Sequence, residues 1–318
     1  MEKFVFLLKT YEKDLRYAIR LIKSFQKYNV DNIKLYIVLP KEDIIKLNSL
    51  LEESDKYNII IKDERSVCPY MVDKPLNGIS AGYINQEIVK LSFWENGLCE
   101  NYFCVDSDAV FIREFGYNDF MASNGFPYTV LLEDKRLKSD PIYYKEFWID
   151  REQSLKKILD EFQMDRHRYM TCHGFQTFNK EVLESLKTEF MRKKHYSYSD
   201  LLEISPYEFS WYNFYLQKTQ IIPINVSDEI FKTFHLKEHY LNSCLNGVEI
   251  GDLARAYVGI VINSNFTNGK SITYGDVNEI HVRVSGKLYR YILKERMYTV
   301  FREPYKVIKH LLLRVLDD

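Results

Sequence analysis

The stretch "YFCVDSDAVFI", residues 102–112, decides the fold, because an apolar run rich in β-forming residues ends there in two carboxylates. A strand that is covered on both faces is apolar along its length, so Asp106 and Asp108 mark the point where such a strand leaves the core. In an open parallel sheet, ligands bind outside the carboxyl ends of the strands. The stretch therefore predicts both a buried strand and the edge of the sheet that carries a site.

The segments before this stretch alternate between apolar runs and amphipathic repeats. The apolar runs cover residues 4–10, 33–40 and 57–64, and apolar residues at helical spacing cover residues 14–28, 41–54 and 78–97. This order of strand and helix is typical of an α/β protein with a parallel sheet flanked by helices. Further along, residues 180–194 predict a helix and residues 220–226 predict a strand.

No internal repeat, low-complexity tract or linker rich in Pro, Gly or Ser divides the chain, so we expect a single domain over residues 1–286. The remaining residues, 287–318, form a basic amphipathic tail, with eight Lys or Arg and two Glu between Lys287 and Arg314. Such a tail can lie on an anionic membrane surface. It can equally be a terminal helix packed on the core or on another subunit, and both interpretations stay open.

Composition excludes several classes of protein. The formal net charge of −1 lacks the global basic field of a general nucleic-acid binder, so we expect no nucleic-acid partner. Five cysteines without a C-x-x-C pair argue against a disulfide framework or a thiolate zinc site and fit a reduced cytosol. The apolar run at the amino terminus is too short for a signal peptide, and we expect no membrane-spanning segment.

The two carboxylates predict a particular chemistry. Asp106 and Asp108 converge if the chain stays extended, or splay around a turn that starts at Ser107. Converging carboxylates repel each other unless a cation lies between them, and hard oxygen ligands favour Mg²⁺ or Mn²⁺. Such an ion neutralises the charge that develops as a phosphate leaves. The alternative is that one or both side chains only end the strand and cap the next turn.

Other kinds of phosphate site lack their defining residues. Phosphatases of the haloacid dehalogenase type also place D-x-D after an apolar strand, but they require Thr at the position of Val110. The sequence contains neither G-x-x-x-x-G-K-[ST] nor G-x-G-x-x-G, so the glycines that cradle phosphates in P-loop and dinucleotide-binding proteins are missing.

The order of the motifs resembles that of the GT-A glycosyltransferases, which use nucleotide sugars. More narrowly, it is similar to bacterial glycosyltransferase-like proteins of surface-polysaccharide synthesis, of the DUF6492 type. The motifs, spread over residues 4–265, are Thr10 with Tyr11, Gln86 and Lys90 ahead of "VDSDAVFIREF", and then "CHGFQTFNKEVLESL", "PYEFSWYNFYL" and "FHLKEHY". The resemblance implies a Rossmann-like, mostly parallel central sheet, with a nucleotide-sugar half (1–115), an acceptor-side half (116–286) and a helical tail.

The resemblance also implies roles for individual residues. The nucleotide sugar would be bound by Thr10, Tyr11, Asp63, Gln86, Lys90 and Ser107, and the metal by Asp106, Asp108 and His235. A base stacked on Tyr11 is physically reasonable. Structural alternatives stay open: Thr10 as a cap, Asp63 as a solvated turn residue, the face of Gln86 and Lys90 as the solvated side of a helix, and His235 as an ordinary histidine.

Two residues are candidates for the acceptor side. Glu208 takes the place of the Glu of the family's S-E-Y-x-x-Y motif, and Tyr212 matches the later Tyr, although Tyr207 replaces the Ser and Asn213 replaces a Gly often found after that Tyr. It could take the proton of the attacking hydroxyl or bind the acceptor, and the alternative is a glutamate on a helix surface. His173, in "TCHGF", is a second polar candidate, with a structural histidine as its alternative.

Together these patterns predict a cytoplasmic, metal-dependent glycosyltransferase of the hexosyltransferase type, at the inner face of the cytoplasmic membrane if the tail binds lipid. The expected donor is a UDP-sugar with Mn²⁺ or Mg²⁺, and the expected acceptor is a hydroxyl of a bacterial surface glycan or glycolipid, such as capsule or lipopolysaccharide. Two alternatives stay open: a metal-dependent phosphohydrolase of nucleotide or sugar phosphates, and a non-catalytic sugar-binding scaffold.

Overall fold

The computed structural model describes residues 1–132, 138–139, 144–165, 175–235, 237–263, 272–274 and 280–282, together with Met297 and Pro304. His173 and nearly all of the basic tail therefore lie outside the described residues. Within the described part of the chain, no helix has both the length and the apolar character that a bilayer crossing requires.

The central sheet has five strands in the order β3-β2-β1-β4-β7. Strands β1 (Glu2–Lys9), β2 (Leu35–Leu39), β3 (Ile59–Asp63) and β4 (Cys99–Val105) run parallel, and β7 (Thr177–Asn179) pairs with β4 in the antiparallel direction. The helices between successive strands supply the crossovers that parallel pairing requires. The predicted class, α/β with a mostly parallel sheet flanked by helices, is confirmed.

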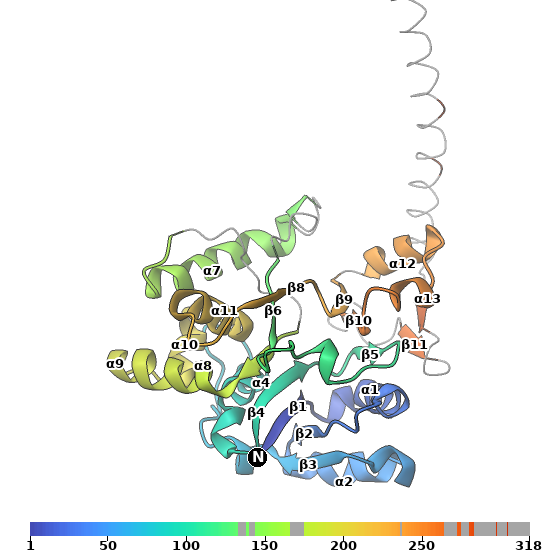
Figure 1. Ribbon diagram of the computed structural model, residues 1–318, viewed down its shortest axis with the longest axis horizontal. Helices are drawn as coiled ribbons and strands as arrows, with labels where there is room; N and C mark the ends of the chain where they lie inside the picture. Colours follow the sequence, from blue (N-terminus) through green and yellow to red (C-terminus); the bar gives the residue numbers. More distant parts are fainter. Residues whose placement is uncertain are drawn as a thin grey trace, which may run out of the picture.

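Helices cover both faces of this sheet. Figure 1 shows α1 (Leu15–Tyr28) and α2 (Lys41–Leu50) on one side, and α4 (Ala81–Ser92), α8 (Lys180–Ser185), α10 (Tyr198–Ile204) and α11 (Glu208–Thr219) on the other. Right-handed crossovers explain the division, because the chain moves outward from β1 to β3 and then returns to β4. The predicted helix over residues 180–194 is confirmed, with π-helical turns at its centre.

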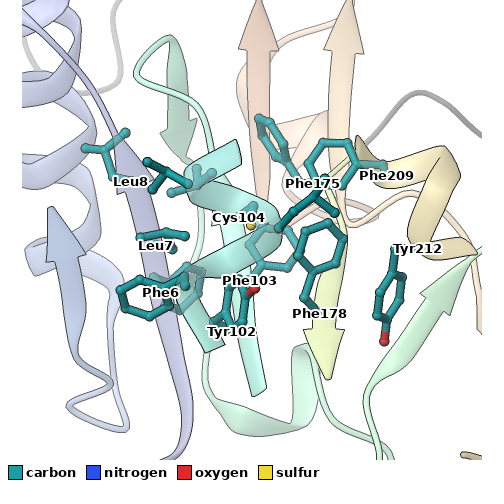
Figure 2. Close-up of a cluster of buried hydrophobic side chains, with 14 of the residues drawn as sticks. Phe6, Leu7, Leu8, Tyr102, Phe103, Cys104, Phe175, Phe178, Phe209 and Tyr212 are labelled. Carbon is teal, nitrogen blue, oxygen red and sulfur yellow. The ribbon is translucent and has the colours of Figure 1, made fainter. Parts of the chain in front are cut away.

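The aromatic residues form the core, and β4 divides them between the two faces. Phe103 contacts Phe6 of β1 with ring centroids 5.6 Å apart, whereas the neighbouring Tyr102 points to the opposite face and contacts Phe178, also at 5.6 Å. Figure 2 shows Phe178 meeting Phe209 and Tyr212 of α11 on this second face. Side-chain alternation along β4 thus fixes which face each following residue takes.

A smaller sheet, β5-β10-β9, continues from the end of β4. β10 (Gly259–Ile262) pairs with β5 (Ala109–Phe111) in the antiparallel direction and with β9 (Phe231–Phe234) in the parallel direction. The predicted strand over residues 220–226 is wrong for most of its length, since β8 (Asn225–Ser227) begins only at Asn225.

The remaining strands and longer helices are α3 (Glu64–Val67), β6 (Tyr128–Val130), α7 (Ile149–Glu161), α9 (Arg192–Lys194), α12 (Lys237–Leu245), α13 (Ile250–Leu253), β11 (Ile272–Tyr274) and β12 (Ile280–Val282). The short helices are η1 (Glu12–Asp14), η2 (Glu53–Lys56), η3 (Phe93–Asn96), η4 (Tyr117–Asp119), η5 (Tyr144–Trp148) and η6 (Leu186–Met191).

Candidate active site

The strand order reverses between β1 and β4, because β2 and β3 extend the sheet on one side of β1 and β4 pairs with its other side. Such a switch point is where open α/β sheets bind ligands. Two predicted site residues meet there, since Ser107 Oγ, just beyond β4, donates to Thr10 Oγ1, just beyond β1, at 2.9 Å. Both side chains are buried.

The D-x-D segment forms a turn. β4 ends at Val105, and the backbone N–H of Ala109 donates to the carbonyl oxygen of Asp106 at 3.0 Å. Of the two predicted backbone geometries, the turn is therefore the one observed. Both carboxylates are half-buried, and Asp106 continues the face of Tyr102 and Cys104, which brings it under α4.

Lys90 of α4 is the centre of a buried ion cluster. Its Nζ lies 2.8 Å from Glu208 Oε1, 3.2 Å from Glu87 Oε2 and 3.2 Å from Asp106 Oδ1. Gln86, one turn before Lys90, donates to the same Asp106 oxygen at 3.2 Å. The helical face that carries Gln86 and Lys90 therefore points at the D-x-D segment, and the alternative of a solvated face is wrong.

Burial and charge act together on this cluster. Burial alone would lower the pKa of Lys90, but the charges of Asp106, Glu208 and Glu87 hold that pKa well above its usual range. Burial opposes ionisation of Glu208 too, yet Lys90 and a hydrogen bond from Glu87 keep the pKa of Glu208 below its usual value. For Glu87, burial and then the charge of Glu208 raise the pKa well above its usual range.

Glu208 is the first residue of α11, and it is buried rather than on a helix surface. A carboxylate at the amino end of a helix is favoured by the helix dipole. A general base works best with a pKa near the operating pH, whereas this carboxylate is held ionised by Lys90. The role of Glu208 toward an acceptor stays a prediction.

The acidic character of the site extends to α1. Asp14, at the amino end of α1, has a pKa raised first by burial and then by the negative charge of Asp106. Asp14 was not among the predicted residues. Its proximity to Asp106 adds negative charge at the switch point, which is what attracts a cation.

Tyr11 and Asp63 lie at the same edge of the sheet, after β1 and β3. Tyr11 is 43% exposed, so its side chain is accessible to a ligand. The Asp63 carboxylate accepts from the N–H of Arg65 at 3.2 Å and caps the short helix α3. Between them, Lys9 pairs with Glu64 at 2.9 Å and donates to the Thr10 carbonyl oxygen at 2.9 Å, which fixes the backbone that presents Tyr11.

His235 lies at the same end of the small sheet as the D-x-D turn. Ala109 pairs with Val261, which pairs with Thr233, so His235 follows β9 two strands from Asp108. Two strand spacings amount to about 10 Å. Burial, followed by the charges of Arg151, His239 and Lys232, lowers the pKa of His235 to about 3, so its imidazole is neutral at physiological pH. Neutral imidazole is the form that binds metals.

The carboxylates at the turn fit a hard divalent cation. Mg²⁺ is commonly held by one or two carboxylates together with phosphate oxygens of the substrate, and Asp106 and Asp108 offer two. Among the residues that the structure describes, no three His, Cys, Asp or Glu side chains gather closely enough to hold a metal ion. His235 therefore does not join the two aspartates as a preformed third ligand.

Glu87 is the member of the cluster that sequence reasoning missed. Ile84, Ile88 and Leu91 define the apolar face of α4, and Glu87 lies on that same face at spacing i+3 from Ile84. A glutamate within an apolar stripe was the available signal. His173 lies outside the described residues, so its predicted role stays a prediction.

The fold and the site define a mainly parallel α/β protein with an acidic, lysine-centred site at its switch point. The chain belongs to DUF6492, a family of unknown function, which matches residues 7–244. No curated protein matches the sequence. A crystal structure of an active-site mutant of LgtC is similar, with a TM-score of 0.44 and 12% identity over 76% of this chain and 78% of that chain. A likeness of this size carries no conclusion about activity.

Proposed function

We propose that this protein is a glycosyltransferase that binds a nucleotide sugar, with UDP as the expected nucleotide, and a divalent cation at the switch point between β1 and β4. The observation that carries the proposal is the meeting of Thr10, Ser107 and the Lys90 cluster at the D-x-D turn. Hydroxyl groups, an ammonium and two carboxylates are the groups that a metal diphosphate and a sugar require.

In this proposal Asp106 and Asp108 hold Mn²⁺ or Mg²⁺, which supplies charge neutralisation for the departing diphosphate when it is bound. Tyr11 stacks on the nucleoside base, and Thr10 and Ser107 hydrogen-bond to the nucleotide. Gln86 fixes the orientation of Asp106, as its 3.2 Å contact supports.

For Glu208, the ion pair with Lys90 supports a role in binding sugar hydroxyls more than a role in proton abstraction. A carboxylate that is held ionised accepts hydrogen bonds from hydroxyl groups without taking the proton. The acceptor, a hydroxyl of a surface glycan or glycolipid, and the membrane contact of the tail rest on the sequence resemblance and composition.

The test is nucleotide binding by calorimetry with UDP in the presence and absence of Mn²⁺. We expect binding that depends on Mn²⁺. Loss of a residue that only supports a metal ligand weakens binding by roughly 10- to 100-fold, so Asp108→Asn, which removes a ligand, should weaken it by at least that much. The control is Asp228→Asn, an exposed aspartate before β9, which should bind as the natural protein does.

The reaction is tested with a panel of nucleotide sugars and Mn²⁺. We expect slow release of nucleoside diphosphate from one donor, because water replaces the missing acceptor. Release of inorganic phosphate, or equal UDP affinity in Asp108→Asn and the natural protein, would contradict the proposal.

A further inference from the structure

The Lys90 cluster contains two buried carboxyl groups and one ammonium. The side chains of Lys90, Glu87 and Glu208 are exposed by only 4%, 3% and 6%, whereas that of Asp106 is 36% exposed. Water therefore screens Asp106 but makes almost no contact with the two glutamates. Buried charges are tolerated when they are paired, and one ammonium can balance only one of these two carboxylates.

The two glutamates meet at the same ammonium. Both carboxyl groups reach Lys90 Nζ, although each comes from a different helix. Ionised carboxylates only accept hydrogen bonds, so two of them cannot share one unless a proton lies between them. Glu87 Oε2 lies 3.2 Å from Lys90 Nζ without forming a hydrogen bond, whereas Glu208 receives one from Lys90 at 2.8 Å.

We propose that Glu87 is a neutral carboxylic acid at physiological pH, that it donates its proton in a hydrogen bond to ionised Glu208, and that it thereby positions Lys90 between Glu208 and Asp106. The protonation state of Glu87 does not depend on the proposed function. Only the effect of Lys90 positioning on nucleotide binding rests on the proposed function. Glu87 is thus a positioning residue that acts on the site through Lys90.

The groups around Glu87 support this assignment. Glu208 of α11, Lys90 of α4 and Asp106 beyond β4 are the charges that act on Glu87, and Lys90 is the only cation among these described groups. Burial raises the pKa of the Cys104 thiol on β4 and of the Tyr83 phenol on α4, so both stay neutral at physiological pH. The excess negative charge around Glu87 therefore favours its protonated form.

A neutral Glu87 has a consequence for the site. Lys90 and Glu208 then balance each other, so Lys90, Glu208 and Asp106 together keep one net negative charge beside the D-x-D turn, which favours a cation there. An ionised Glu87 would compete with Asp106 for Lys90, since both lie 3.2 Å from its Nζ. The shared proton thus keeps Lys90 in contact with Asp106.

The protonation state is tested on the full chain without any ligand, by infrared spectroscopy at pH 8 in H₂O and D₂O. Ordinary carboxyl groups are ionised at this pH, so a carboxylic acid band that shifts on deuteration reports a buried protonated group. We expect the band in the natural protein, its loss in Glu87→Gln and its retention in Glu95→Gln, a glutamate paired with Lys187 elsewhere.

Glu208→Gln is the second variant, and it should also remove the band, because Glu87 ionises opposite Lys90 once the charge of Glu208 is gone. Absence of the band from the natural protein at pH 8, or its persistence in Glu87→Gln, would overturn the proposal. Neither result depends on nucleotide binding, so a failure here is distinct from a failure of the proposed function.

Positioning is tested by UDP affinity in the presence of Mn²⁺. Glu87→Ala should lower the affinity by about 10-fold or more, as the loss of a residue that supports a metal ligand does. Glu87→Gln should recover most of that loss, because an amide also donates a hydrogen bond. Equal losses in the two variants would contradict positioning by a neutral donor.

Discussion

Two clusters centred on lysines link α4 and η3 to other helices. Lys90 links α4 to α11, and Lys187 links η6 to η3, but the two clusters differ in composition. In the first, Lys90 of α4 contacts Glu87, Glu208 and Asp106. In the second, Lys187 of η6 pairs with Glu95 of η3, and the hydroxyl groups of Tyr70 and Tyr198 donate to the same carboxylate at 2.6 Å.

The difference lies in burial and charge balance. The Lys187 cluster has one cation, one carboxylate and neutral phenols, and its charged side chains are 28% and 21% exposed. The Lys90 cluster has more carboxyl groups than cations and almost no contact with water. A balanced, partly solvated pair serves to join two elements. An unbalanced buried cluster is costly to maintain, which fits a role at a site more than a role in stability.

The largest effect is expected for Lys90→Met. The substitution keeps the apolar part of the side chain but leaves Glu208 and Glu87 buried without a cation, so the free energy of unfolding should fall by about 3 to 5 kcal/mol. Urea unfolding at pH 7.5 measures it. Part of the loss should return at lower pH, where Glu208 can take up a proton. A loss of less than about 1 kcal/mol would show that removing Lys90 leaves no uncompensated buried charge in the variant.

A smaller effect is expected for the pH dependence of Glu87→Gln. The pKa of Glu87 is higher in the folded protein than in the unfolded chain, so the natural protein loses stability as pH rises from about 4.3 toward the folded pKa. Glutamine does not titrate. The stability of Glu87→Gln relative to the natural protein should therefore rise with pH, by about 2 kcal/mol between pH 5 and pH 6.5, since each pH unit in which only the unfolded chain is ionised contributes about 1.4 kcal/mol.

Urea unfolding at several pH values measures this difference, and the other titrating groups cancel when the two proteins are compared. A difference that does not change with pH would mean that Glu87 has the same pKa in both states. Glu95→Gln serves as the matched control, since Glu95 belongs to the balanced cluster.

The comparison also shows what local sequence could predict. The strands β1 to β4 and helices α1, α2 and α4 follow from apolar runs and helical spacing, which are local properties of the chain. The i+4 spacing of Gln86 and Lys90 placed them on one face, and the apolar run before Asp106 placed it at a strand end. In a parallel sheet the helix before a strand packs over the sheet and begins at the edge where that strand ends, so Gln86 and Lys90 can reach Asp106.

The remainder depends on contacts between distant segments. β7 has only three residues, Thr177–Asn179, and its pairing with β4 is set by tertiary packing rather than by its own pattern. Glu208 reaches Lys90 because α11 packs against α4, more than a hundred residues earlier in the chain. His235 reaches the end of the small sheet only through β10. None of these placements has a local signal.

The smallest effect is expected for Lys187→Met. Its ammonium is partly solvated, and after its removal Glu95 keeps its hydrogen bonds from Tyr70 and Tyr198, so no carboxylate is left buried and unpaired. The free energy of unfolding should fall by about 1 kcal/mol, with UDP affinity unchanged. If urea unfolding instead shows a loss equal to that of Lys90→Met, burial and charge balance do not set the energetic difference between the clusters, and Lys90 does not compensate an excess of buried carboxyl groups.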